Sequence, residues 1–223
     1  MNTQIIILLG VPGSGKGTQA KKLKDDFGFA HISSGDLLRA LASDENANPI
    51  LKEKLAAMKA GKLVANDLIY TLVFGEIEKQ IASGKNVVLD GAIRNVEQAQ
   101  KFDEFFAEKE LSESVVVVEF TMPDELSLMR LTKRKNCSVC GHIIAYSPDN
   151  DAKTVCEKCG GALVVRTDDT PEIALKRIAE QGNAVVAPVR EYYVEKGNYI
   201  EVDAVQDIDG MEKDLVEALG LVR

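Results

Sequence analysis

Four short apolar runs divide the chain. They cover residues 5–9, 87–89, 115–118 and 199–202, and Ile, Val and Leu dominate the first three. Between the first two runs, apolar residues recur every three or four positions over residues 68–81, which is helical spacing. Uninterrupted β-branched strands that alternate with helices are typical of a parallel sheet covered on both faces. The pattern therefore predicts an α/β fold with a parallel sheet core covered by helices.

Helix boundaries and interruptions add detail to this pattern. A helical stretch begins at Lys16 and stops before Gly28, and further helices are expected after Pro123 and Pro171, with proline in the first turn. Two stretches break the rhythm: residues from about 34 to 66 contain helical pieces but no strand, and residues 135–168 hold all four cysteines. We interpret both stretches as insertions at the edge of the sheet.

Charge and hydropathy limit the possible partners. The 223 residues include 27 Lys and Arg against 35 Asp and Glu, a net charge of −8, which argues against a protein that coats nucleic acid. A small phosphate ligand stays possible because it responds to the local field. The apolar run near the start is too short to span a bilayer and is not part of a signal peptide. We therefore expect a cytoplasmic protein with neither a membrane nor a nucleic-acid partner.

The sharpest motif lies at residues 10–18, which read GVPGSGKGT. This segment matches the P-loop pattern and sits between a predicted strand and a predicted helix, where backbone N–H groups can wrap a phosphate. Lys16 would supply a positive charge to the β- and γ-phosphates. Gly17 stands where the motif usually has Ser or Thr, so we expect water-mediated rather than direct holding of Mg²⁺. The competing interpretation is a glycine-rich turn without a ligand.

The cysteines form two C-x-x-C pairs, Cys137 with Cys140 and Cys156 with Cys159. Two such pairs, fifteen residues apart, can present four thiolates tetrahedrally to Zn²⁺, and sites made only of cysteine are of the structural type. Two disulfides or four unrelated thiols are the alternatives. The neighbouring His142 is expected to be a bystander.

Acidic and basic residues complete the candidate chemistry. Asp90 ends an apolar strand, a position from which a carboxylate can hold Mg²⁺ or its waters in a P-loop protein. His31 is expected to be structural. Phosphoryl transfer needs several convergent arginines. The candidates are Arg39, Arg94, Arg130, Arg134, Arg166 and Arg177.

Taken in order, these motifs resemble the adenylate kinase family, within the nucleoside-monophosphate kinases, in its long-lid, zinc-containing form. The similarity runs nearly end to end. It rests on residues 10–20, 32–39, 60–64 and 89–91, on Arg94 and residues 98–99, on both cysteine pairs, and on residues 166–169 with Arg177.

The resemblance implies a domain organisation and a reaction. Residues 1–33, 65–133 and 172–223 would form a P-loop core, residues 34–64 a monophosphate-binding insert, and residues 134–171 a zinc lid. The implied enzyme transfers a phosphoryl group reversibly from MgATP to AMP, giving two ADP. It would use Mg²⁺ with ATP and a structural Zn²⁺, and we expect a monomer.

The resemblance also implies residue roles. ATP would be held by Gly13, Ser14, Gly15, Lys16, Gly17, Thr18, Arg130, Arg134 and Gln206. AMP would be held by Ser34, Arg39, Lys62, Leu63, Val64, Gly91, Arg94, Gln98, Arg166 and Arg177. The catalytic set would be Lys16, Arg94, Arg134, Arg166, Arg177, Asp90, Asp168 and Asp169, and the metal ligands Cys137, Cys140, Cys156 and Cys159.

Two alternatives to this reaction stay open, and the first of them rests on a departure from the family. Ala92 and Ile93 stand where the family usually has Phe-Pro, beside the implied AMP site. The first alternative is a kinase for another nucleoside monophosphate, such as UMP or CMP. The second is an ATP-binding sensor that does not transfer the phosphoryl group.

Overall fold

The computed structural model describes residues 3–43, 66–165 and 169–222, and all structural statements refer to these residues. In chain order the elements are β1 (Ile5–Leu9), α1 (Lys16–Phe27), β2 (Ala30–Ser33), α2 (Ser34–Ser43), α4 (Asn66–Ala82), β3 (Val87–Asp90), α5 (Val96–Glu108), η1 (Ser112–Ser114), β4 (Val115–Thr121), α6 (Asp124–Lys133), β5 (Lys135–Cys137), β6 (Ile143–Ile144), α7 (Pro148–Asp151), β7 (Leu163–Val164), α8 (Pro171–Gln181), α9 (Asn183–Lys196), β8 (Tyr199–Asp203) and α10 (Ile208–Ala218).

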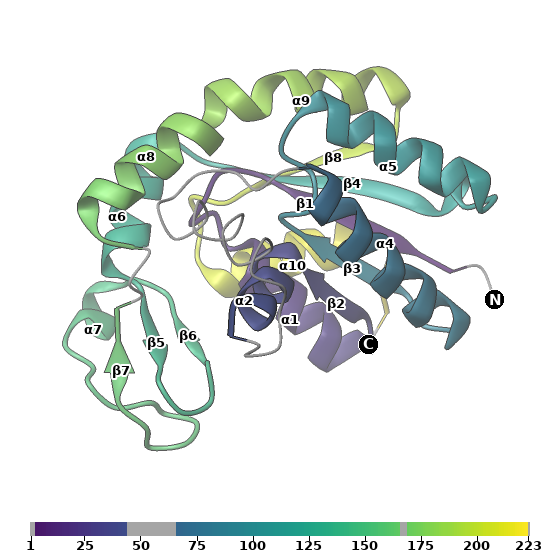
Figure 1. The fold of residues 1–223 in the computed structure, drawn as a ribbon. Helices are drawn as coiled ribbons and strands as arrows, with labels where there is room; N and C mark the ends of the chain where they lie inside the picture. The colour runs from purple at the N-terminus through teal and green to yellow at the C-terminus, as the bar shows by residue number, and fades with distance from the viewer. Residues whose placement is uncertain (1–2, 44–65, 166–168, 223) are drawn as a thin grey trace.

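A five-stranded sheet with the order β2-β3-β1-β4-β8 forms the centre of the molecule (Figure 1). All of its strand pairs are parallel, and Ile5 of β1 lies opposite Val87 of β3 on one side and Val115 of β4 on the other. In a parallel sheet the strands end at the same edge. The loops that follow β1, β3 and β4 therefore meet there, at the place where ligands bind in open α/β sheets.

Helices cover both faces of this sheet. Ile5, Ile7 and Leu9 pack with residues of α2, α4, α5 and α9, whereas Ile6 and Leu8 pack with residues of α1 and α10. Because successive strand residues point to opposite faces, an apolar residue at every position of β1 supplies both cores. The predicted α/β fold, with a helix-covered parallel sheet, is confirmed.

Strand β2 is the one strand of this sheet that the hydrophobic pattern does not predict. It lies at the sheet edge, where Ala30 and His31 are half-buried and Ile32 is buried. An edge strand packs on fewer neighbours, so a run as short and mixed as Ala-His-Ile-Ser is enough to form it. Helices begin after both prolines, as predicted. Pro171 lies in the first turn of α8, whereas Pro123 is the N-cap residue just before α6.

A second, smaller sheet stands apart from the first, below α6 in Figure 1, and its strands come between α6 and α8 in the chain. Its strands have the order β6-β5-β7 and are antiparallel. This segment lies within the predicted lid. Of the predicted monophosphate-binding insert, the structure describes α2, and its remaining residues lie outside the described ranges.

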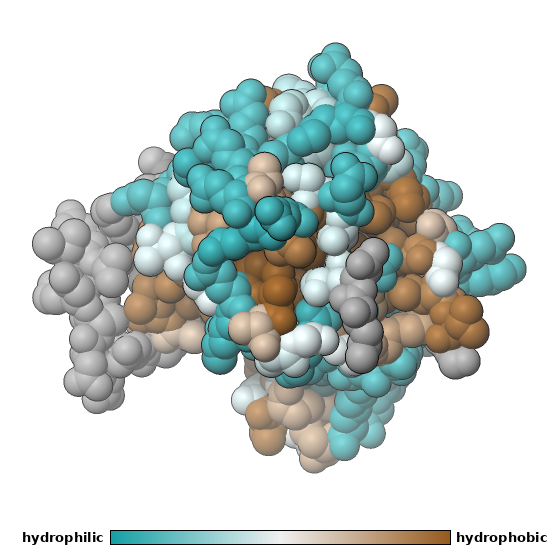
Figure 2. Space-filling view, turned by 90° about the vertical axis from the view of Figure 1, so that its right-hand side faces the viewer, coloured by the Kyte–Doolittle hydropathy of each residue, from teal (hydrophilic) through white to brown (hydrophobic). Residues whose placement is uncertain are grey.

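The outer surface of the core is mixed in character. Figure 2 views the end of the molecule where β1 begins, and hydrophilic side chains spread over this face with apolar side chains gathered near its middle. Within the parts of the chain that the structure describes, no helix combines the length and apolar character needed to cross a membrane.

Candidate active site

The loop between β1 and α1 is shaped by glycine. Gly10, Gly13 and Gly15 have φ angles of 127°, 82° and 96°, which other residues rarely adopt. A Cβ atom on Gly10 would lie 2.5 Å from the carbonyl oxygen of Phe120 in β4, so no larger residue fits there. The loop can therefore turn tightly at the sheet edge directly before α1, and the first N–H groups of a helix, which have no partner within it, can bind phosphate.

Lys16 lies folded against this loop. Its Nζ donates hydrogen bonds to the carbonyl oxygens of Gly10 at 2.7 Å and Val11 at 2.8 Å, and to Ser14 Oγ at 3.2 Å. Burial lowers the pKa of Lys16 to about 8, and the charges of nearby arginines add to this effect while Asp90 opposes it. The lysine thus sits in a strongly positive site where an anion would stabilise its charge.

Asp90, at the end of β3, faces the start of α1. A Cβ atom on Gly17 would lie 3.1 Å from Asp90 Oδ2, so the glycine leaves room for this carboxylate beside the loop. Burial alone would raise the pKa of Asp90, but His31, whose Nε2 lies 3.7 Å from Oδ2, and the charge of Lys16 lower it below its usual value. The Asp90 carboxylate therefore lies beside Gly17, the position at which the P-loop motif usually has a Ser or Thr hydroxyl.

Arg94 lies four residues after Asp90, in the loop that follows β3. Its Nε donates to the carbonyl oxygen of Gly91 at 3.1 Å, and the same oxygen accepts a 2.6 Å hydrogen bond from Ser34 Oγ. Burial and the neighbouring charge of Arg177 lower the pKa of Arg94 to about 10. This guanidinium is held between backbone and side-chain oxygens, in a region where positive charges repel one another.

A fully buried carboxylate joins two more arginines. Arg134, which follows α6, donates from Nε to Asp169 Oδ2 at 2.5 Å and from Nη2 to Oδ1 at 2.9 Å. Arg177 of α8 donates to the same Oδ1 at 2.7 Å, and the Asp169 side chain has no exposed surface. In this arrangement Asp169, which the resemblance places in the catalytic set, organises two arginines.

Arg130 of α6 binds the loop after β8. Its guanidinium donates to the carbonyl oxygens of Ala204 at 2.7 Å, Val205 at 3.1 Å and Gln206 at 3.4 Å. The Gln206 side chain itself donates to Asp214 of α10 at 2.7 Å. Arg130 and Gln206, both predicted to contact ATP, therefore lie together at one end of the site.

A cleft of about 960 Å³ brings most of the predicted residues together. Those that line it are Gly13, Gly15, Lys16, Gly17, Thr18, Arg39, Asp90, Gly91, Arg94, Arg130, Arg134, Arg177 and Gln206. Ser14, Ser34, Gln98 and Asp169 are buried behind the lining. Lys62, Leu63, Val64, Arg166 and Asp168 lie outside the described residues.

The amide of Gln98 is engaged within the protein. Its Oε1 accepts a hydrogen bond from the backbone N–H of Arg94 at 2.7 Å, and its Nε2 donates to Asn66 Oδ1 at 2.8 Å. Gln98 is only 3% exposed, so in this arrangement it supports the Arg94 backbone. Arg39 is more exposed, and its Nη2 donates to Asp36 at 2.6 Å.

Several cleft residues are not predicted from the sequence. Gln181, at the end of α8, lines the cleft and contacts Arg94, and residues 141–147 line it from the small sheet. His31, expected to be structural, lies against Asp90. The one local signal for Gln181 is its position four residues after Arg177, which places both on one face of the helix.

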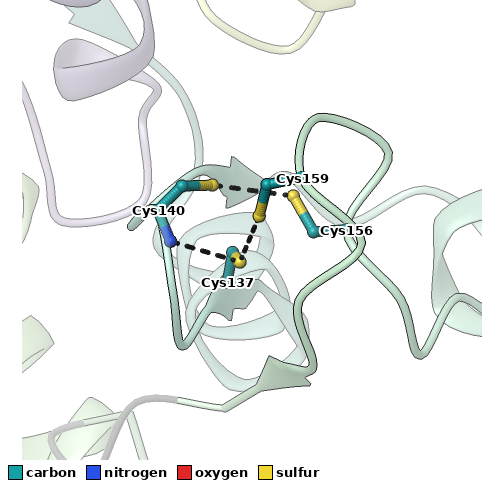
Figure 3. A group of neighbouring side chains, drawn as sticks. All are labelled: Cys137, Cys140, Cys156 and Cys159. Carbon is teal, nitrogen blue, oxygen red and sulfur yellow. Dashed lines mark hydrogen bonds between the residues drawn. The ribbon is translucent and has the colours of Figure 1, made fainter.

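The four cysteines converge at the small sheet (Figure 3). The Sγ atoms of Cys137 and Cys159 are 3.4 Å apart, those of Cys140 and Cys156 are 3.7 Å apart, and all four lie within 4.8 Å of one another. The backbone N–H groups of Cys140 and Val139 point at Cys137 Sγ and lower the pKa of this thiol. Four sulfur atoms at these distances, with backbone donors to one thiolate, fit a tetrahedral Zn²⁺ site.

A P-loop on a parallel sheet, with arginines lining the same cleft, defines a nucleotide phosphotransferase of the P-loop class. The sequence model of the family described as "Adenylate kinase" matches residues 8–198. The chain therefore belongs to the adenylate kinase family of enzymes. Adenylate kinases from several organisms are similar to it over almost their whole length. That of Borrelia turicatae is 34% identical over 215 residues, 96% of this chain and 98% of that protein.

Two further relatives have the same extent of similarity. The adenylate kinase of Caldanaerobacter subterraneus is 36% identical over 218 residues, 96% of this chain and 95% of that protein. The adenylate kinase of Archaeoglobus fulgidus is 35% identical over 225 residues, 98% of this chain and 99% of that protein. The resemblance inferred from the motifs is thus confirmed at the level of the family.

Proposed function

We propose that this chain carries out the reaction of its family, the reversible transfer of the γ-phosphoryl group of MgATP to AMP, which gives two ADP. The observation that supports this most directly is one cleft that is lined by the P-loop, with Lys16, and also by Arg94. A protein that only senses ATP needs the P-loop with Lys16 but not Arg94. Two separate phosphate-binding elements in one cleft suit a donor and an acceptor.

On the donor side, the loop N–H groups and Lys16 hold the phosphates. Lys16 exchanges its hydrogen bonds to the Gly10 and Val11 carbonyl oxygens for phosphate oxygens, because an anion stabilises its buried charge better than neutral carbonyls do. Arg130 and Gln206 lie beside the place where the donor base enters.

On the acceptor side, Arg94 and Arg39 bind the monophosphate of AMP. Ser34 and Gln98 support this side through Gly91 and the Arg94 backbone. The undescribed residues Lys62, Leu63 and Val64 complete the AMP site in this proposal, and Arg166 and Asp168 complete the catalytic set.

The chemical step needs no covalent enzyme intermediate. Phosphoryl transfer depends on placing the acceptor oxygen in line with the leaving oxygen and on neutralising charge that spreads over the phosphoryl group. Arg94, Arg134, Arg177 and Lys16 supply that charge from the walls of the cleft. Mg²⁺ bound with ATP would neutralise part of the phosphate charge, and Asp90, which lies beside Gly17, would hold its waters.

The small sheet is the part that moves in this proposal. An open cleft would let water attack ATP, and closure of the predicted lid, residues 134–171, over the cleft would exclude that water. A Zn²⁺ ion on Cys137, Cys140, Cys156 and Cys159 would hold the lid together, because so small a sheet has little core of its own. Four reduced thiols suit the cytoplasm, and the enzyme is proposed to act there as a monomer.

The test is a coupled assay of ADP formation from ATP with AMP, GMP, UMP or CMP as acceptor. We expect AMP to be preferred, and Lys16→Met to lower turnover by orders of magnitude with the fold intact. Lys85→Met, at an exposed site before β3, is the matched control and keeps wild-type turnover. Preference for UMP or CMP would identify the other monophosphate kinase, and tight ATP binding without ADP formation would identify the sensor.

A further inference from the structure

Gln181 is the last residue of α8 and reaches Arg94 across the cleft wall. The Oε1 atom of Gln181 accepts a hydrogen bond from Arg94 Nη1 at 2.9 Å, although the two residues are 87 positions apart in the chain. Arg177 lies four residues earlier on the same helix face, and both side chains line the cleft. A glutamine that no motif singles out therefore touches the arginine assigned to the acceptor phosphate.

Among the described residues, the two hydrogen-bond acceptors of the Arg94 guanidinium are neutral. Nε donates to the carbonyl oxygen of Gly91 and Nη1 to the amide oxygen of Gln181. A guanidinium has five N–H donors in a planar fork, so two fixed bonds orient the plane and leave donors for a ligand. Neutral acceptors fix the direction of the fork without cancelling its charge, whereas a carboxylate would do both.

Gln181 is itself fixed at its backbone. The next residue, Gly182, has no room for a side chain, because a Cβ atom would lie 2.5 Å from the carbonyl oxygen of Ile178 and 2.9 Å from Asp124 Oδ2. Asn183 then donates from Nδ2 to the carbonyl oxygen of Met122 and to Asp124 Oδ1, both at 2.9 Å. The junction of α8 and α9 is thus pinned to the start of α6, which gives Gln181 a rigid base.

We propose that Gln181 is a positioning residue for the acceptor: it aims the Arg94 guanidinium at the monophosphate of AMP and, being uncharged, adds no negative charge that would compete with that phosphate. This inference rests on the proposed function and adds to it a residue that sets acceptor affinity. It also explains why α8 contributes two different side chains to one wall of the cleft, Arg177 as a charge and Gln181 as a support.

Two substitutions separate orientation from charge. Gln181→Met keeps the length of the side chain and removes the acceptor, so Arg94 loses one of its two fixed bonds. Gln181→Glu keeps an acceptor but pairs a carboxylate with Arg94 and competes with the phosphate. A hydrogen bond to a charged group is stronger than the contact with water that would replace it. We therefore expect each change to raise the KM for AMP about tenfold. The KM for ATP should stay within about twofold of wild type, because Lys16 and the loop are untouched.

The controls exclude a merely structural effect. Gln100→Met makes the same chemical change at an exposed residue of α5 and should leave both KM values and the unfolding temperature as in wild type. Gln181→Met should also unfold at the wild-type temperature. In an Arg94→Lys background, Gln181→Met should add less than about twofold to the KM for AMP, because its partner is already gone.

The outcomes distinguish this inference from the proposed function. If the wild-type chain forms ADP from ATP and AMP while Gln181→Met leaves the KM for AMP unchanged, Gln181 does not position Arg94 and only the inference fails. An equal rise in the KM for ATP, or a full tenfold effect in the Arg94→Lys background, also overturns it. If the wild-type chain forms no ADP from ATP and AMP, the proposed function itself is wrong.

Discussion

The arginine pair held by Asp169 gives the most direct test of the site. Asp169 has no exposed side-chain surface and, from the described residues, accepts three hydrogen bonds, two from Arg134 and one from Arg177. Asp169→Asn keeps the shape of the side chain but removes its charge and turns one acceptor into a donor that faces a guanidinium. Two arginines then share one neutral oxygen in a cleft where positive charges already crowd.

The size of the effect follows from burial. Removing one partner of a buried ion pair costs about 3 to 5 kcal/mol. The Arg134 and Arg177 side chains keep 15% and 18% of their surface exposed, so water can replace part of the lost interaction. We therefore take the lower end, about 3 kcal/mol. For a chain of this length, each kcal/mol corresponds to about 2–4 °C, which predicts a fall of about 9 °C in the unfolding temperature.

Scanning calorimetry without nucleotide measures this shift. Asp209→Asn is the matched control, because Asp209 is 89% exposed and pairs with Lys22 at 3.4 Å, and its unfolding temperature should change by less than about 2 °C. Raising the salt concentration should remove the small control effect and leave the large one, since buried pairs are little screened. A shift for Asp169→Asn no larger than that of the control would refute the reasoning. Turnover should also fall, because both arginines lose their shared anchor.

Two further changes test the loop and the metal site. The pKa of Lys16 is lowered to about 8, against 10.5 in a free side chain, so the folded protein loses this charge near pH 8. Because phosphate binds the charged form, the affinity for ATP should fall about tenfold per pH unit above that value. Calorimetric titrations at pH 7, 8 and 9 measure this, and a pH-independent affinity in the wild type, or the same pH dependence in Lys16→Met, would contradict it. Cys156→Ser removes one of four sulfur ligands and should reduce bound zinc from one atom per chain to nearly none, with a fall of about 6 °C in unfolding temperature. Elemental analysis of the purified variant decides this, and a full complement of zinc would show that the four sulfurs do not act as one site.

The parts of the molecule that could be predicted from the sequence are those that depend only on residues close together in the chain. The runs of Ile and Val in β1, β3 and β4 specify buried strands whatever lies elsewhere, and the glycines before Lys16 specify a loop that no other residue type allows. The cysteine spacing is equally local. Strand β2 was harder, because an edge strand does not need a continuous apolar run.

The remaining contacts depend on residues far apart in the chain. Asp169 meets Arg134 across 35 positions and Gln181 meets Arg94 across 87, and neither pair has a spacing that a pattern can reveal. Glutamine is also common at the ends of exposed helices, so its type carries little signal. The structure supplies what the sequence lacks by folding α8 back over the loop that follows β3.

The glycine that opens the P-loop also has a consequence for how the sheet is assembled. All five residues of β1 are apolar and buried, so a shift of one position along its neighbours would exchange the two faces without exposing any polar group. The alternation of hydrophobic and polar residues, which sets the register of most strands, therefore does not set the register of β1. Gly10 breaks this degeneracy, because its missing Cβ is the only reason that the chain can pass the Phe120 carbonyl oxygen at that one position. The residue that lets the loop receive phosphate thus also locks the central strand in place.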